Sequence, residues 1–348
     1  MEERVETALY QKYGPSPPIL ARERLAAEIQ SSIRGAKRED LKQIISFCDM
    51  LKFHNCPYYF AQTAASSFLF YLLGLSPTNP LPPHYICPVC HRMEFIFDDS
   101  TIDGFDLSPR RCTCGALMEV DGHNLKGEYF LADERLMGLV MIPVNRYAEI
   151  VSLAMELYKP NEQPVEPYAP DQFAVFPSVA LATDTELPSY CENWFNPLSI
   201  GSTKQFILRN LRSLLPIEDH GKNQNTRRVL QSMCTRIETF FSAIRYVSLM
   251  RFCWKEDVDI TAFLDSVPLP DGILFREDVF DHYIGLGVTA EVAYRQMNRL
   301  KRGRQETISL NTQEHLRFIE KARVYASMPS KVWAIEYLLS MAKKGLYT

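Results

Sequence analysis

Apolar residues recur at helical intervals near the start of the chain. Between residues 20 and 53 they form two such groups, Leu25 with Ile29, and then Leu41, Ile44, Ile45 and Leu51. This spacing places them on one face of amphipathic helices. Proline-rich breaks at 15–18 and 79–83 stop regular structure on either side. The pattern therefore predicts helices within residues 20–53.

The middle of the chain has a mixed pattern. The run from Leu136 to Val144 is apolar throughout and bounded by charge, which predicts a buried strand. Residues 85–125 are rich in turns and carry clustered cysteines, as in a small zinc ribbon. Four prolines within residues 159–170 predict a linker or long loop.

Helical spacing returns at Gln205 and continues to the end, with breaks near Pro216, at 268–270 and near Gly303. We therefore predict an α/β part followed by an α-helical part. Four segments follow from the pattern: a helical start at 1–84, a Cys-rich insertion at 85–125, an α/β remainder at 126–204 and a helical domain at 205–348.

Composition places the chain among ordinary globular proteins. It has 348 residues, of which 46% are apolar and 23% charged, with a formal net charge of −4. That charge gives no overall attraction to nucleic acid, so DNA binding would depend on local basic patches. The run from Phe68 to Leu75 is too short to span a bilayer, and no secretory signal is present, so no membrane association is expected. Nine cysteines, an odd number, suit a reducing cytoplasm.

Two cysteine pairs suggest a metal site. Cys87 and Cys90 form a Cys-x-x-Cys pair, and Cys112 and Cys114 form a Cys-x-Cys pair, with 21 residues between the two pairs. Paired thiolates at such spacing are typical of structural, tetrahedral zinc. His91 or His123 could replace a thiolate, and the alternative is a decayed site that holds buried, reduced cysteines. The remaining cysteines are single and read as core residues: Cys48, Cys56, Cys191, Cys234 and Cys253.

Two basic runs are candidates for phosphate contacts. The candidate nucleic-acid-binding residues are Arg227, Arg228, Arg299, Lys301, Arg302 and Arg304. Arg209, Arg212, Lys222 and Arg295 lie near them in sequence. Glutamates such as Glu291 and Glu306 are also close, so a solvated helix face is an equally good reading.

One segment carries a family resemblance. Asn79-Pro-Leu-Pro-Pro-His-Tyr leads directly into Cys87-Pro-x-Cys90, and this resembles a signature of the C-type DNA polymerase III alpha subunit of Gram-positive bacteria. Shorter pieces follow in the same order as in that family, including Asp121-Gly-His123, Arg276-Glu-Asp-Val-Phe280 and Lys301-Arg-Gly303. The resemblance implies a palm-like α/β part, a zinc-ribbon insertion and helical fingers, without the family's exonuclease and clamp-binding regions.

The resemblance also locates where polymerase chemistry would occur. The family holds two Mg²⁺ ions with an Asp-x-Asp strand and a third carboxylate before a glycine. These positions are occupied here by Met141, Pro143 and Leu198. None of these side chains offers the oxygen ligands that Mg²⁺ requires, so Mg²⁺ is not expected. The family's phosphate-cradling turn reads Ala61–Ser67. Only Arg276 and Lys331 remain as a possible nucleotide-binding remnant.

These features favour a catalytically inactive relative of the polymerase. Such a protein would bind DNA through local basic patches or associate with replication proteins. One alternative is a protein-interaction or regulatory scaffold that keeps only the fold. Another is a DNA polymerase with relocated metal ligands, for which Asp257 and Asp259 offer a carboxylate pair. Those two aspartates lie between helical segments, where aspartate commonly caps a helix.

Overall fold

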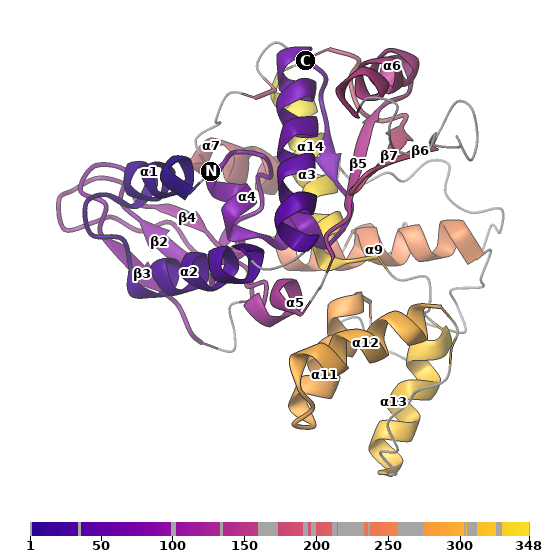
Figure 1. Cartoon of the computed structure of the whole chain (residues 1–348). Coiled ribbons are helices and arrows are strands. Elements are labelled where there is room, and N and C mark those ends of the chain that lie inside the picture. The colour runs from indigo at the N-terminus through magenta and orange to yellow at the C-terminus, as the bar shows by residue number, and fades with distance from the viewer. Residues whose placement is uncertain are drawn as a thin grey trace. The chain divides into compact units, whose positions relative to one another are not determined.

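A computed structural model describes most of the chain. The described residues are 2–33, 36–98, 102–132, 135–158, 173–190, 194–195, 200–210, 214, 233–235, 237–256, 274–302, 304, 312–324 and 329–347. The chain forms two compact units: residues 1–207 with 335–348, and residues 208–334. Figure 1 shows the elements of both units.

The first unit contains a four-stranded sheet in the order β1-β5-β7-β6. Its strands are β1 (Tyr59–Phe60), β5 (Gly138–Pro143), β6 (Phe173–Phe176) and β7 (Val179–Asp184). Strands β5 and β7 run parallel, whereas β1 and β6 are antiparallel to their neighbours. β5 is the strand that the apolar run at 136–144 predicts, and as a central strand it pairs on both sides.

Side chains alternate across the sheet and give its two faces different surroundings. One face carries Val140 and Ile142, both fully buried. Helix α3 (Ala36–Phe53) covers this face, since a Cβ on Gly138 would lie 3.3 Å from the Ile44 side chain. Phe47 of α3 also packs on Phe176 of β6, with ring centroids 5.9 Å apart.

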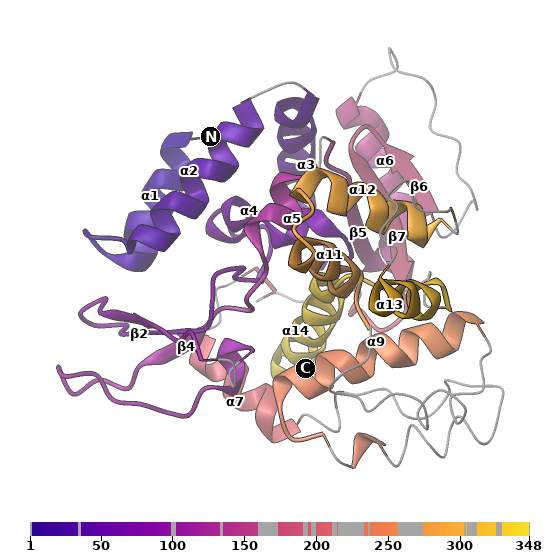
Figure 2. The same cartoon turned by 90° about the horizontal axis from the view of Figure 1, so that it is seen from below.

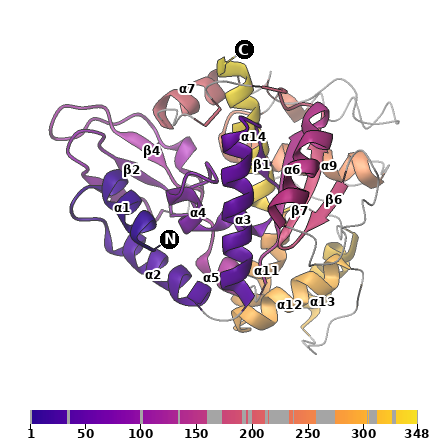
Figure 3. The same cartoon turned by 45° about the horizontal axis from the view of Figure 1, so that its top comes forward.

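Helix α6 (Tyr147–Tyr158) adds to the same layer. Tyr158 stacks on Phe176 at 5.7 Å and on Phe47 at 6.5 Å. The opposite face carries Met141 and is only partly buried. Figure 3 shows α3 and α6 beside the strands of this sheet.

A second, three-stranded sheet forms the Cys-bearing part of the first unit. Its order is β3-β2-β4, with β2 (His84–Ile86), β3 (Met93–Phe95) and β4 (Glu119–Asp121), all antiparallel. A small cluster fills one side and consists of Tyr85, Cys87, Leu107, Cys112, Met118 and Val120. This sheet and its loops are called the ribbon below.

Helices complete the first unit. They are α1 (Glu2–Tyr13), α2 (Ile19–Ile33), α4 (Phe68–Leu72), α5 (Gly127–Leu131) and α7 (Ile200–Asn210), and the last of these runs to the boundary between the units. Short 3₁₀ turns lie at Thr63–Ser66, Gly104–Asp106 and Val144–Arg146. The helices expected within residues 20–53 are thus confirmed as α2 and α3.

The second unit is helical in its described residues. It contains α9 (Phe240–Glu256), α11 (Arg276–Gly285), α12 (Ala290–Lys301) and α13 (Gln313–Val324), and α14 (Lys331–Tyr347) begins in it. α11 and α12 form a hairpin, and Gly287 between them has φ +78°, a left-handed conformation that favours glycine. Figure 2 shows α11, α12 and α13. The predicted α/β class followed by helices is confirmed at this level.

Some predictions fall outside the described residues or stay untested. The expected linker at 159–170 lies outside them. The four-segment boundaries at 1–84, 85–125, 126–204 and 205–348 stay predictions. Among the described residues, no helix is both long and apolar enough to cross a membrane.

Most of α14 belongs to the first unit and carries a buried carboxyl there. The Oε1 atom of Glu336 accepts hydrogen bonds from the hydroxyls of Ser76, at 2.5 Å, and Thr78, at 2.7 Å. Glu336 is fully buried. Burial raises its pKa to about 6, although the two hydroxyls act in the opposite direction.

This shift predicts an unusual pH dependence. Because the folded chain binds the Glu336 proton more tightly than the unfolded chain, the stabilisation is complete below pH 4.5 and is lost as the pH rises through about 6. The difference corresponds to roughly 2 kcal/mol. Urea unfolding of the wild type and Glu336→Gln should therefore show their stability difference changing by about this amount between pH 4 and pH 7. Glu39→Gln, the same substitution at an exposed position of α3, is the control.

Candidate metal centre and neighbouring sites

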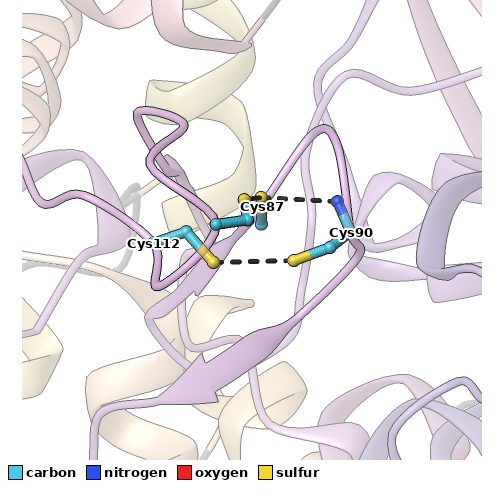
Figure 4. A group of neighbouring side chains, drawn as sticks. Cys87, Cys90 and Cys112 are labelled. Carbon is cyan, nitrogen blue, oxygen red and sulfur yellow. Dashed lines mark hydrogen bonds between the residues drawn. The ribbon is translucent and has the colours of Figure 1, made fainter.

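Four cysteine sulfurs meet at one end of the ribbon. The Sγ atoms of Cys87, Cys90, Cys112 and Cys114 all lie within 4.8 Å of one another. Two contacts join the pairs: Cys87 to Cys114 and Cys90 to Cys112, each at 3.5 Å. Figure 4 shows Cys90 and Cys112 pointing toward each other from two loops. Among the described residues this is the only group of three or more potential metal ligands.

Both loops turn through a left-handed residue just after their second cysteine. His91 has φ +55° and Gly115 has φ +90°. The His91 N–H donates to the Cys87 carbonyl at 3.0 Å, and the Gly115 N–H donates to the Cys112 carbonyl at 2.9 Å. These turns bring each second cysteine back toward the first. The shorter Cys-x-Cys half therefore presents both of its sulfurs to the site.

Backbone donors favour the thiolate form of the first cysteine in each loop. The Cys90 N–H donates to the Cys87 sulfur at 3.5 Å and lowers the pKa of that thiol. The backbone N–H of Cys114 likewise lowers the pKa of Cys112, to about 6. Thiolates are the form that binds a metal, so these hydrogen bonds favour the ligand form of both cysteines.

The sulfur arrangement fits zinc. A tetrahedral Zn²⁺ with Zn–S bonds of about 2.3 Å has sulfurs about 3.8 Å apart. The two cross-loop distances of 3.5 Å are close to that edge length. Four thiolates also exclude Mg²⁺ from this site, since it takes oxygen ligands. With four protein ligands no position is left for a reacting water, so a metal here would be structural. Zinc binding itself stays a prediction.

The histidines considered as substitutes lie apart from this group. His123 is fully buried, and its Nδ1 lies 2.9 Å from the Asp103 carboxylate. His91 occupies the left-handed turn, and neither ring belongs to the cluster. The four cysteines alone can supply a tetrahedral set.

The proline-rich segment before the cysteines holds the ribbon to the helices. The Asn79 amide donates to Asp121 Oδ2 at 2.7 Å, and the Tyr71 hydroxyl donates to the same oxygen at 2.5 Å. Burial opposes ionisation of Asp121, but Lys12, the two nearby histidines and the Asn79 amide together keep its pKa below the usual value. This buried carboxylate joins α4, residue 79 and β4.

The sheet face around Met141 carries few ligands. Met141 is half-buried and Pro143 is buried, and both side chains lie on the face opposite α3. Asp184 at the end of β7 pairs in register with Pro143. Its Oδ2 accepts a hydrogen bond from the Tyr59 hydroxyl at 2.6 Å. Leu198 lies outside the described residues. Among the described residues of the four strands, Asp184 is the only carboxylate, and its partner is the Tyr59 hydroxyl.

The turn before α4 is filled by a carboxylate of the chain itself. Glu28 is fully buried and accepts hydrogen bonds from the N–H groups of Phe68 and Leu69 and from the Ser67 hydroxyl, at 3.0, 3.1 and 2.8 Å. Arg24 pairs with it at 2.6 Å. Donors that could face a phosphate therefore already have an internal anion. Sequence reasoning missed Glu28, because its spacing reads as an ordinary helix face.

The basic candidates are placed only in part. Arg227 and Arg228 lie outside the described residues, and so does the side chain of Lys301. Arg299 is half-buried near the end of α12, whereas Arg302 and Arg304 just after it are exposed. The backbone N–H groups of Arg302 and Arg304 both donate to the Arg299 carbonyl, at 3.0 and 2.9 Å. These three residues therefore lie together at one helix end.

The two nucleotide-binding candidates lie near each other in the second unit. Arg276 and Lys331 are both buried, and the Arg276 N–H donates to the Pro329 carbonyl at 3.1 Å. The Lys331 N–H donates to Glu277 at 2.9 Å. Burial raises the pKa of Glu277 to about 7, although Arg276 favours the ionised form.

Comparison with known proteins finds a short region of similarity. No protein-family model matches the chain. Over 70 residues it is 43% identical to the PolC-type DNA polymerase III of Streptococcus agalactiae and of Streptococcus thermophilus, and 41% identical to that of Streptococcus pyogenes. The matched region is 20% of this chain and only 5% of each relative. A segment of the chain is thus related to PolC-type polymerases.

The cysteine geometry predicts a measurable zinc affinity. Cys112→Ser should weaken zinc binding by about 3 kcal/mol, roughly a hundredfold, because one of four ligands to a site worth about 10–16 kcal/mol is lost. Competition with a chromogenic chelator at pH 7.5 measures this. Cys56→Ser is the matched control, since that buried thiol lies 3.6 Å from the Pro57 carbonyl and a hydroxyl can donate there too. Equal zinc affinity in all three proteins would contradict the four-cysteine site.

Proposed function

We propose that this chain is a non-catalytic, DNA-associated relative of the PolC-type polymerase III alpha subunit. In this proposal the first unit corresponds to a palm-like part with a zinc-bearing ribbon, and the second unit to helical fingers. The short similarity to PolC-type polymerases supports the relationship. The proposed partners are DNA and, through it, other replication proteins, in the cytoplasm.

The observation that carries the non-catalytic reading is the composition of the β5 face. Two-metal catalysis needs several carboxylates around ions about 3.5–4 Å apart. The central strand offers Met141 and Pro143 at adjacent positions of that face, and the neighbouring strand offers Asp184 alone, already bound by Tyr59. A single carboxylate cannot hold two Mg²⁺ ions against their preference for multiple oxygen ligands.

The filled turn before α4 supports the same reading. Glu28 accepts hydrogen bonds from the hydroxyl of Ser67, the last residue of the segment Ala61–Ser67 that the resemblance identifies with the phosphate cradle, and from the N–H groups of Phe68 and Leu69 just after it. A phosphate that displaced the Glu28 carboxylate would break its ion pair with Arg24, and breaking a buried ion pair is energetically costly. We therefore propose that Arg276 and Lys331 are a remnant of nucleotide binding whose cations now serve the packing of the second unit.

DNA association rests on the basic end of α12. Arg302 and Arg304 are exposed there, and Arg299 lies beside them. Cations at a helix C-terminus also complement the helix dipole, which is the purely structural explanation for them. Phosphate binding predicts, in addition, an affinity for DNA that falls as the salt concentration rises. With Lys301, Arg227 and Arg228 they form the proposed nucleic-acid surface.

Primer extension separates the inactive reading from the relocated-ligand alternative. Purified chain with a primed template, all four deoxynucleotides and either Mg²⁺ or Mn²⁺ should give no templated product above the level of a buffer blank. An active PolC-type polymerase in the same reactions is the positive control. Incorporation that follows the template would show that carboxylates outside the β5 face hold the metals.

The DNA-binding proposal predicts a salt-dependent affinity. Fluorescence anisotropy with a labelled primer–template should show weaker binding as salt rises, and Arg302→Ala/Arg304→Ala should reduce the salt slope by about 1 for each lost phosphate contact. Arg22→Ala/Arg38→Ala removes the same charge from exposed sites on α2 and α3 and is the control.

Two outcomes of that titration would count against DNA association. Binding that is absent at low salt, or binding that both double variants weaken equally, would favour the scaffold alternative. In that case the fold has been kept for contacts with protein, and the cations at the end of α12 act only on their own helix.

A further inference from the structure

The four ribbon cysteines differ in exposure in a regular way. Cys87 and Cys112 are buried within the small cluster of the ribbon, whereas Cys90 and Cys114 are exposed. The 3.5 Å contacts join Cys87 to Cys114 and Cys90 to Cys112. Each contact therefore pairs one exposed sulfur with one buried sulfur from the other loop.

A sulfur of one loop that lies 3.5 Å from a sulfur of the other suits a two-step thiol oxidation. An oxidant converts one of the two sulfurs to a sulfenic acid, and the other sulfur then resolves it into a disulfide. A disulfide needs its sulfurs about 2.05 Å apart, so a pair at 3.5 Å closes with a movement of about 1.5 Å. Bonds within one loop would instead have to form across Cys-x-x-Cys or across the still tighter Cys-x-Cys.

We propose that the ribbon is a site of reversible oxidation, in which a hydroperoxide converts the four thiolates into the disulfides Cys87–Cys114 and Cys90–Cys112 and expels the metal ion. The thiol pairing rests on the sulfur positions alone. The release of zinc also rests on the proposed function, because that function includes a bound zinc ion.

The chemistry of each bond balances with one molecule of hydrogen peroxide. One thiolate of a pair attacks a peroxide oxygen, the O–O bond breaks, and a sulfenic acid and hydroxide form. The partner thiolate then attacks the sulfenic sulfur and displaces a second hydroxide. Two protons from solvent convert the hydroxides into two waters, so two thiolates lose two electrons and the peroxide gains them. A disulfide sulfur is a poor ligand for zinc, and the ion is therefore released.

Other cysteines provide an internal comparison. Cys48 and Cys56 are fully buried, and burial raises the pKa of each thiol to about 12. Thiols held protonated and shielded react slowly with peroxide. Oxidation should therefore be confined, among these six cysteines, to the four of the ribbon.

Peptide mapping of the peroxide-treated protein tests the pairing. Trypsin cleaves after Arg92, Arg110 and Arg111, so it separates the two loops into different peptides. Cross-loop disulfides should then give one linked pair of peptides that disappears on reduction, together with release of zinc to a chromogenic chelator. Disulfides confined to single loops, or oxidation of Cys48 or Cys56 at an equal rate, would overturn the proposal.

Two double variants assign the partners. Cys90→Ser/Cys112→Ser leaves Cys87 with Cys114 and should still form the linked peptides. Cys90→Ser/Cys114→Ser leaves Cys87 with Cys112 and should form them at least tenfold more slowly. Equal rates would contradict the assigned partners, and the wild-type map stands as the test if either variant fails to fold.

Metal analysis before peroxide is added separates the two proposals. If the purified protein holds no zinc but still forms the cross-loop disulfides, the zinc proposal is wrong and the oxidation proposal stands. If it holds zinc but forms no cross-loop disulfide, the oxidation proposal is wrong and the zinc proposal stands.

Discussion

The fold of the first unit depends on one buried carboxylate. Asp121 ends β4 and receives hydrogen bonds from Tyr71 of α4 and from the Asn79 side chain, and Lys12 of α1 is close enough to favour its charge. Two parts of the chain that are distant from β4 in sequence, α1 and residues 71–79, thus meet at the Asp121 carboxylate. Removing the Tyr71 or the Asn79 side chain would leave the buried Asp121 charge with fewer partners. Loss of a partner to a buried charge typically lowers the free energy of unfolding by several kcal/mol. The proline-rich segment carries no chemistry of its own and serves to hold Asn79 at this point.

Internal carboxylates accept hydrogen bonds from buried donors at three further places. Glu28 accepts hydrogen bonds at the start of α4, Glu336 of α14 accepts them from two hydroxyls, and Glu277 accepts one from the first N–H of α14. Each of these acids is buried at a place where an unsatisfied donor would be costly. The raised pKa values of Glu336 and Glu277 show that burial outweighs the donors they receive. These anions thus take up hydrogen-bond donors of the chain itself.

The local sequence pattern predicted several elements of the fold, but it could not predict contacts between residues that are distant in sequence. Spacing alone predicted the helices α2 and α3, the strand β5 and the grouping of four cysteines. The role of Asp121 was hidden, because its partners lie 42 and 50 residues away and aspartate is usually exposed. The parallel pairing of β5 with β7 is equally non-local. The Cys-x-Cys half could not be judged from spacing, since its reach depends on the left-handed turn at Gly115.

The ribbon is fastened at both ends by unrelated means. The sulfur cluster closes its loops, whereas Asp121 fixes the opposite end of β4 through Asn79 and Tyr71. Loss of the cluster therefore opens the loops without releasing the stem. Amide hydrogens around residues 87–92 and 112–116 would exchange with solvent while those of β2 and β4 near His84 stay protected. Without the sulfur cluster, the two loops would therefore have low local stability while the stem of the ribbon stays folded.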